Sequence, residues 1–194
     1  MSGPTEPQHI LWLDLETAGL AVTDPILEIA TVVTDMQLNE PETGSRVQAV
    51  VRPPRDNRSW LQNMHHVALE MHVNSGLIAE VREAKYEIEQ IDHDIATGLQ
   101  ACYPDEIFAL GGSGVAHFDR AVIRQQMPFL SSLLTYWCID VGNVRRFATR
   151  VMGVNFERTE IAHRAMPDVE QSIAEAKRLR TILDPAALYH PKAG

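Results

Sequence analysis

Residues 10–16 read Ile10-Leu11-Trp12-Leu13-Asp14-Leu15-Glu16, an apolar run that closes on two carboxylates. The run is apolar enough for a central strand that is covered on both faces. Because residues two apart on a strand share a face, Asp14 and Glu16 are expected side by side, roughly 7 Å apart. Burying two such charges without a cation is costly, and hard oxygen ligands suit Mg²⁺ or Mn²⁺. The alternative is an exposed strand end whose carboxylates bind nothing.

The rest of the chain alternates between strand-like and helix-like patterns. Strands at residues 26–35 and 47–51 follow the first one after short connections, which predicts an antiparallel meander. Three opening strands, with helices and strands alternating after them, imply an α/β fold in layers with a mixed central sheet flanked by helices. The other predicted elements are strands at residues 107–110 and 135–139 and helices at residues 60–69, 74–82 (capped by Asn74 or Ser75), 86–102, 118–127, 141–151 and 168–183.

Length and cysteine content limit the class of protein. A chain of 194 residues, 45% of them hydrophobic, is typical of one globular domain. We place this domain at residues 10–184, between a flexible segment 1–9 and a tail 185–194. Two cysteines exclude a disulfide scaffold and a four-cysteine zinc site. Residues 1–9 lack the features of a signal peptide, and no apolar run approaches the ~20 residues that cross a bilayer, so we expect a cytoplasmic protein.

The net charge of −9 disfavours tight binding to long nucleic-acid duplexes, which usually requires a basic face. This charge is spread unevenly along the chain. Residues 1–97 hold 16 of the 26 acidic side chains, whereas residues 98–194 hold 11 of the 17 basic ones. Most of the arginines in residues 98–194 are expected on solvated helix faces, but the uneven charge leaves room for a local anion site in this half.

Three further residues have side chains suited to catalysis. Asp119 follows a glycine-rich segment near the start of a predicted helix, and Asp168 follows Pro167 at the start of the last one. Each is explained equally well as a helix cap or a partner of the helix dipole. His163 lies five residues before Asp168 in a predicted loop, and a lone histidine is more often structural than catalytic.

In combination, these residues resemble the DEDDh 3′-to-5′ exonucleases, and most of all their oligoribonuclease family. The order is an Asp-x-Glu on the first strand, a central Phe-Asp that ends at Asp119, and a late histidine five residues before an aspartate. The resemblance extends from Ile10 to Leu183, nearly the whole chain. It is strongest in three segments: residues 11–20 together with 28–30, residues 71–77, and residues 163–168.

The resemblance implies a ribonuclease H-like three-layer fold with a mixed five-stranded sheet and two divalent ions, Mg²⁺ or Mn²⁺. Ions about 3.5–4 Å apart serve an in-line displacement, and an imidazole can take a proton from the attacking water. The implied activity is 3′-to-5′ hydrolysis of short single-stranded RNA to 5′-mononucleotides by a homodimer. The implied roles are metal ligand for Asp14, Glu16, Asp119 and Asp168, general base for His163, and substrate contact for Thr17, Leu20, His72 and Tyr136.

The sequence departs from the oligoribonuclease pattern near the substrate rather than at the metal. Val67 stands where the family usually has a tryptophan, and a base stacked on an aromatic ring contributes about 1–3 kcal/mol. Trp137 stands where the family has an arginine that helps to cap the 5′ phosphate. We therefore expect intact metal chemistry and an altered phosphate cap, which leaves the substrate length preference open.

Three alternatives remain beside this interpretation. A DNA-directed 3′-to-5′ exonuclease of the proofreading type would carry the same metal residues, because contact with the 2′-OH often comes from the backbone or from one side chain. A module that only binds nucleic-acid ends would not need all five catalytic residues. An HD-type phosphohydrolase would use His66, His93 and Asp94, but that class is all-helical and the opening strands argue against it.

Overall fold

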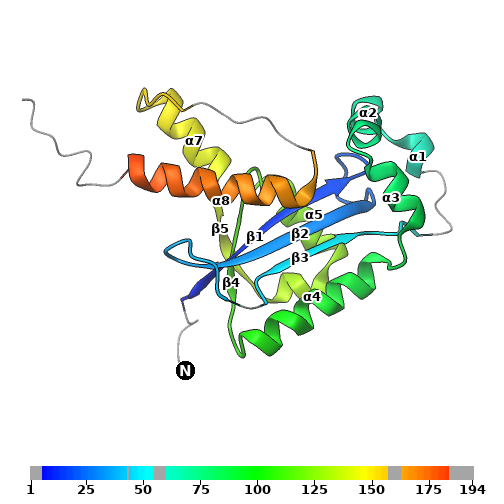
Figure 1. The fold of residues 1–194 in the computed structure, drawn as a ribbon, viewed down its shortest axis with the longest axis horizontal. Helices are drawn as coiled ribbons and strands as arrows, with labels where there is room; N and C mark the ends of the chain where they lie inside the picture. Colours follow the sequence, from blue (N-terminus) through cyan, green and yellow to red (C-terminus); the bar gives the residue numbers. More distant parts are fainter. Residues whose placement is uncertain (1–5, 43, 55–59, 157–162, 184–194) are drawn as a thin grey trace, which may run out of the picture.

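A mixed five-stranded sheet forms the centre of the fold (Figure 1). The computed structural model describes residues 6–42, 44–54, 60–156 and 163–183. The strand order is β3-β2-β1-β4-β5; β1 pairs with β2 and β2 with β3 in antiparallel fashion, whereas β1–β4 and β4–β5 are parallel. The predicted meander and mixed sheet are therefore confirmed. The strands are β1 (His9–Thr17), β2 (Ile26–Asp35), β3 (Arg46–Val50), β4 (Phe108–Gly112) and β5 (Leu134–Asp140).

Helices cover both faces of this sheet and one of its ends. α4–α6 pack on one face, α7 and α8 pack on the other, and α1–α3 lie together at one end (Figure 1). None of the helices in the described part of the chain combines the length and apolar character that a bilayer crossing requires. The helices are α1 (Trp60–Asn63), α2 (His66–Asn74), α3 (Leu77–Glu83), α4 (Ile88–Cys102), α5 (Asp119–Gln126), α6 (Pro128–Ser132), α7 (Val141–Arg150) and α8 (Ala165–Ile182).

The alternation of β1 decides which helices its side chains meet. Leu11, Leu13 and Leu15 are buried against α4–α6, whereas Ile10 and Trp12 are buried against α7 and α8. The row that begins with Ile10 and Trp12 continues with the two carboxylates, since residues two apart share a face. The apolar row thus directs both carboxylates toward α8.

Local boundaries differ from prediction around the end of the sheet. A single helix at residues 60–69 is wrong, because extended backbone at His65 separates α1 from α2 and its imidazole accepts a hydrogen bond from the amide of Val67. The predicted cap by Asn74 or Ser75 is also wrong, since left-handed Gly76 precedes α3. The helix predicted at residues 118–127 does end before Pro128, as α5, but Pro128 then starts a helix that was not predicted, α6, where a proline at the first position is favourable.

Both predicted chain ends fall largely outside the described residues. The segment 1–9 is described only from residue 6, and β1 already begins at His9, whose Nδ1 lies 2.8 Å from Oε1 of Glu106. The predicted tail 185–194 lies wholly outside the described residues. The predicted last helix begins three residues earlier than expected, at Ala165, so Pro167 lies in its first turn.

Trp12 is the largest of the fully buried side chains, and its polar atom has one partner. The indole Nε1 donates a hydrogen bond of 2.8 Å to Oγ1 of Thr34 on β2. Gly111 on β4 allows this packing, because a Cβ atom there would lie 2.9 Å from the Trp12 ring. The indole therefore depends on Thr34 to satisfy its N–H in a dry interior.

Replacing Thr34 by valine keeps the shape of this side chain and removes the acceptor. We expect T34V to lower the free energy of unfolding by about 1–3 kcal/mol, since the indole N–H stays buried without a partner. Urea denaturation measures the loss. T181V removes an exposed hydroxyl from α8 and is the matched control, with an expected change of about 0.5 kcal/mol or less. Equal stability of wild type and T34V would contradict the role of the hydrogen bond.

Candidate active site

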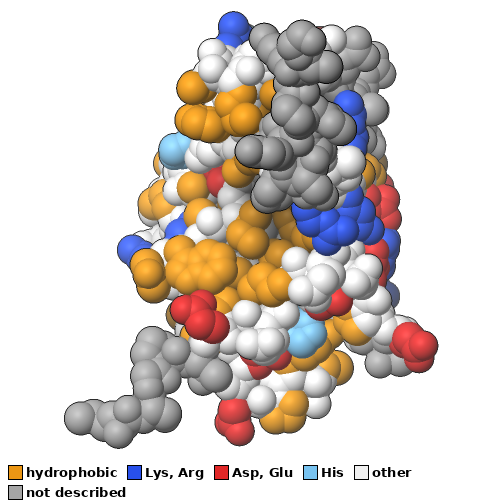
Figure 2. Space-filling view, turned by 90° about the vertical axis from the view of Figure 1, so that its left-hand side faces the viewer, with side chains coloured by type: hydrophobic (Ala, Val, Ile, Leu, Met, Phe, Trp, Pro, Cys, Tyr) orange, Lys and Arg blue, Asp and Glu red, His pale blue; other side chains and the backbone are white. Residues whose placement is uncertain are grey.

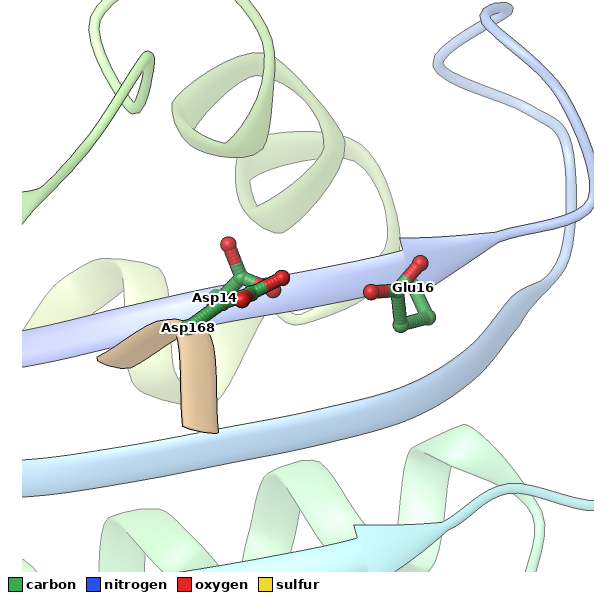
Figure 3. A group of neighbouring side chains, drawn as sticks. All are labelled: Asp14, Glu16 and Asp168. Atoms are coloured by element: carbon green, nitrogen blue, oxygen red, sulfur yellow. The ribbon is translucent and has the colours of Figure 1, made fainter. Parts of the chain in front are cut away.

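Three carboxylates meet where β1 passes beneath the start of α8. Asp14 and Glu16 project from β1, and Asp168 projects from the first turn of α8 (Figure 3). One carboxylate oxygen from each residue lies within 4.8 Å of the other two. This is the one such group of three or more acidic, histidine or cysteine ligands in the part of the chain that the structure describes. The structure thus brings Asp14, Glu16 and Asp168 together, and their role as metal ligands stays a prediction.

The local structure of both elements explains this meeting. The register of β1 with β2 shifts between Glu16 and Thr17, so the regular ladder ends directly after the second carboxylate. On α8, the amide of Asp168 donates to the carbonyl of Arg164 at 3.2 Å and closes the first helical turn. A carboxylate in the first turn of a helix also interacts favourably with the helix dipole.

Asp119 lies close to this group without belonging to it. It is the first residue of α5 and is buried, and backbone amides of Leu15 and of Asp119 itself donate to its carboxylate. Burial raises the pKa of Asp119 to about 7 against the lowering effect of these hydrogen bonds. Asp119 is also the neighbouring charge that most strongly raises the pKa of Asp14. The predicted fourth acidic residue therefore faces the same charged region from α5.

Burial and mutual repulsion disfavour the charged forms of the cluster. Burial is the main cause that raises the pKa of Asp14 well above its ordinary value, and Asp119, Glu16 and Asp168 add to it. Burial also raises the pKa of Glu16 to about 8, with Asp168 as the strongest neighbouring charge. A group of buried and half-buried carboxylates with too little positive charge nearby is an arrangement that a divalent cation stabilises.

His163 borders two cavities at this site. It has a left-handed backbone with φ of 53° and lies two residues before α8. A cavity of about 190 Å³ is lined by His163 together with Asp14, Asp168 and Ser113. A neighbouring cavity of about 430 Å³ is lined by His163 together with residues of α2 and the turn after it. The imidazole therefore stands between the carboxylates and an open space beside α2.

A third cavity of about 400 Å³ lies beside Glu16 and collects three of the predicted substrate contacts, Thr17, Leu20 and His72. Leu20 is 88% exposed at the tip of the turn after β1. The Thr17 hydroxyl donates to the carbonyl of Gly19 at 2.7 Å, so Thr17 supports that turn. Val67, the residue that replaces the family tryptophan, also lines this cavity and is half-exposed.

His72 is buried and packs against the end of β1. Its Nε2 donates to the carbonyl of Thr17 at 3.0 Å, and its Nδ1 lies 3.7 Å from Oε2 of Glu16. Among the described residues Nδ1 has no hydrogen-bond partner. Burial lowers the pKa of His72, which keeps the ring neutral at physiological pH. His72 therefore holds the end of β1 through Thr17 and lies beside Glu16 without a hydrogen bond to it.

Tyr136 is the predicted contact that the single chain does not bring to the site. It lies on the edge strand β5, is 91% exposed and lines a separate hollow of about 260 Å³. Trp137, beside it, packs partly buried against the core under α7 and α8.

His93 and Asp94 are exposed on α4, and His66 belongs to α2, so these residues form no metal group among the described residues.

The sequence analysis missed Glu28, which is fully buried on β2 directly opposite Glu16 in the sheet register. It also missed Arg164, whose guanidinium lies 2.9 Å from the Glu28 carboxylate. A charged residue inside the otherwise apolar run of residues 26–33 was the available signal. No local pattern connects it with an arginine 136 residues later.

Comparison with known proteins identifies the family to which this chain belongs. The profile of the family described as "Exonuclease" matches residues 11–176. Curated oligoribonucleases are similar over most of their length: that of Aliivibrio fischeri is 33% identical over 89% of this chain and 94% of its own. That of Rhodococcus jostii is 34% identical, over 88% of this chain and 85% of its own. The chain belongs to the exonuclease family, among the oligoribonucleases.

Solved exonuclease structures share the fold. E. coli exonuclease I in complex with a 5cy-dT13 oligonucleotide superposes with a TM-score of 0.67 at 17% identity and covers 95% of this chain. The chain spans 43% of that exonuclease I chain, so the comparison concerns one part of a longer protein. Together with the mixed five-stranded sheet, this likeness confirms the predicted ribonuclease H-like fold.

The raised pKa of Glu16 predicts how the metal-free oligoribonuclease fold responds to pH. A carboxyl whose pKa is higher in the folded state binds more protons there, so its contribution to stability is lost as pH rises from about 4.5 toward 8. We expect wild-type protein in EDTA to lose roughly 2–3 kcal/mol more than E16Q between pH 5.5 and 8. Thermal unfolding at both pH values measures the difference. Parallel profiles for the two proteins would contradict the raised pKa.

Proposed function

We propose that this protein is a 3′-to-5′ exoribonuclease that hydrolyses short oligoribonucleotides to 5′-mononucleotides. The observation that carries the proposal is the convergence of three carboxylates within 4.8 Å beside a cavity that His163 also lines. The oligoribonuclease relatives support the reaction, because they align along most of their own length. A relative in the mouse, described as a mitochondrial oligoribonuclease, is 28% identical over 92% of this chain.

The donor set fits divalent ions such as Mg²⁺ or Mn²⁺. We propose that Asp14, Glu16, Asp119 and Asp168 hold two of them. All four donors are hard carboxylate oxygens, and the raised pKa values of Asp14, Glu16 and Asp119 reflect a shortage of positive charge that cations relieve. When bound, such ions supply Lewis-acid stabilisation of the charge that develops in an in-line phosphoryl displacement.

The chain's own residues provide the remaining parts of the reaction. His163 serves as general base, because its ring lines the cavity of Asp14 and Asp168 and can accept a proton from the attacking water. His163 has a left-handed backbone and lies before α8, outside any helix or strand. Its imidazole therefore projects from a loop. The ring then gives this proton up to solvent in the adjoining cavity beside α2, and the departing 3′ oxygen takes up a proton from solvent.

The cavity beside Glu16 suits the terminal base of the substrate. Leu20 offers an exposed apolar surface against the base, and Met71 and Val67 form an apolar wall. Thr17 and His72 hold this side of the site through the hydrogen bonds at the end of β1. With Val67 in place of an aromatic residue, the base loses a stacking partner, so we expect weaker binding rather than a different reaction.

The overall charge favours short substrates over long ones. A net charge of −9 repels long polyanions, and bound cations would offset this repulsion only near the cluster of carboxylates. We therefore propose a short, single-stranded 3′ end as the substrate. The likeness to bacterial oligoribonucleases supports the cytoplasm as the compartment. DNA of the same length is the competing substrate, and the length series below separates the two.

We further propose that two copies of the chain associate. The edge strand β5 and helix α7 carry exposed hydrophobic side chains, and hydrophobic side chains gather on this side of the molecule (Figure 2). Tyr136 on this edge is then available to the partner's active site. Light scattering at assay concentrations tests the proposal, and a monomer that retains full activity would refute it. The exposed hydrophobic residues are Tyr136 of β5, Val144 and Phe147 of α7, and Val151 directly after α7.

A length series tests the proposed activity. Labelled RNA and DNA of two to about twenty nucleotides are incubated with Mg²⁺ or Mn²⁺, and the products are resolved. We expect 5′-mononucleotides from RNA, at rates that fall as the length grows because longer polyanions are repelled. Activity independent of length would contradict the specialisation for short substrates, and preference for DNA would favour the proofreading type. D14N is the inactive control, since it removes a metal ligand.

Removing the imidazole tests the general base. We expect H163A to lower kcat by about 10²–10⁴-fold, because general bases typically contribute this much, and to change KM by less than about fivefold. Single-turnover kinetics on a short RNA measure both parameters. H66A, which removes an exposed histidine of α2, is the matched control and keeps the wild-type rate. Full activity of H163A at neutral pH would assign the proton transfer to another group.

A further inference from the structure

Glu28 is a fifth carboxylate near the candidate active site, but hydrogen bonds already occupy it. Its side chain is fully buried, and four donors reach it: Nε and Nη2 of Arg164, the amide of Ala165 and Nε2 of Gln48, at 2.8–3.0 Å. Burial alone would raise the pKa of Glu28, yet the hydrogen bonds from Arg164, Ala165 and Gln48 bring it below its ordinary value. Glu28 is therefore a charged anchor rather than a metal ligand.

Arg164 uses its entire guanidinium to join three parts of the fold. Two of its N–H groups bind Glu28 on β2, two bind Glu80 on α3, and one binds the carbonyl of Ser75 between α2 and α3. A guanidinium has five N–H donors in a rigid fork, so every donor has a partner. Lysine has neither this number of donors nor the planar geometry.

The position of Arg164 in the chain gives this network a consequence for the site. It directly follows His163, whose left-handed backbone is uncommon for a residue with a side chain. It also precedes α8, and the amide of Ala165 is bound to the same Glu28 carboxylate as Arg164. The backbone on the C-terminal side of His163 is therefore held by two consecutive residues.

We propose that Glu28 and Arg164 form a positioning clamp that holds His163 at the wall of the cavity shared with Asp14 and Asp168. The clamp acts through His163 and sets the rate of hydrolysis, not the affinity for substrate. This inference rests on the proposed function, because it assigns the clamp to the general base of that reaction. Neither Glu28 nor Arg164 contacts the substrate in this scheme, so both are positioning residues.

Arg46 offers a matched control for the clamp. It also bridges two glutamates, Glu40 and Glu170, through hydrogen bonds of 2.5–2.8 Å, but it lies exposed on β3. We compare the hydrolysis of RNA of about two to five nucleotides by R164K, E28Q and R46K. R164K and E28Q are expected to lower kcat by about 10- to 100-fold with KM within about threefold of wild type, because a displacement near 1 Å at a reacting group costs this much. R46K is expected to leave both parameters unchanged.

A double-mutant cycle separates positioning from a general structural role. In the H163A background, R164K is expected to reduce kcat by less than about twofold, since the group through which it acts is already absent. Mn²⁺ affinity of R164K, measured by calorimetry, is expected within about threefold of wild type. A multiplicative loss in H163A, a tenfold weaker Mn²⁺ site, or a lowered Tm with unchanged kcat would each overturn the clamp.

The outcomes also distinguish the clamp from the function on which it rests. If E28Q does not fold, R164K and the Glu80 variant E80Q, which loosens the exposed half of the network, carry the same comparison. An active wild type together with R164K at full rate overturns the clamp alone. A wild type that hydrolyses neither RNA nor DNA of any length overturns the proposed function and the clamp with it.

Discussion

Repulsion among closely spaced, buried and half-buried carboxylates is the constraint on which the rest of this structure depends. Asp14 and Glu16 end an apolar strand, and Asp119 and Asp168 face the same region from two helices. In an interior of low dielectric, such charges destabilise one another unless cations or protons neutralise them. The divalent cations of the proposed chemistry would neutralise these carboxylates.

The neighbouring Glu28 and His72 do not neutralise the negative charge of this cluster. Glu28 stands opposite Glu16 in the sheet, yet Arg164, Ala165 and Gln48 satisfy it completely. His72 is buried and neutral behind Glu16, so it adds no positive charge to the cluster. Two neighbouring positions on paired strands thus carry the same residue type, glutamate, with opposite electrostatic surroundings.

The sequence predicted the parts of this site that depend on local pattern. The alternation along β1 predicted that Asp14 and Glu16 share a face, and the meander followed from the short connections. Convergence with Asp168 and His163 came from the resemblance to a family, because no periodicity links residues 150 apart. The pairing of Glu28 with Arg164 was missed for the same reason: the charge of Glu28 stands out within β2, but nothing local connects it with an arginine so far along the chain. The split between α1 and α2 depended on one histidine cap that propensity does not reveal.

One structural feature joins folding to activity. Because Ile10, Trp12, Asp14 and Glu16 form a single row on β1, the pairing that buries Trp12 also orients the carboxylates. A slip of one residue between β1 and β2 would turn that row to the opposite face, moving Trp12 toward α4–α6 and the acidic groups into an apolar layer. Misregistered chains would thus be unstable as well as inactive. The chains that fold stably are then the chains in which Asp14 and Glu16 face Asp168.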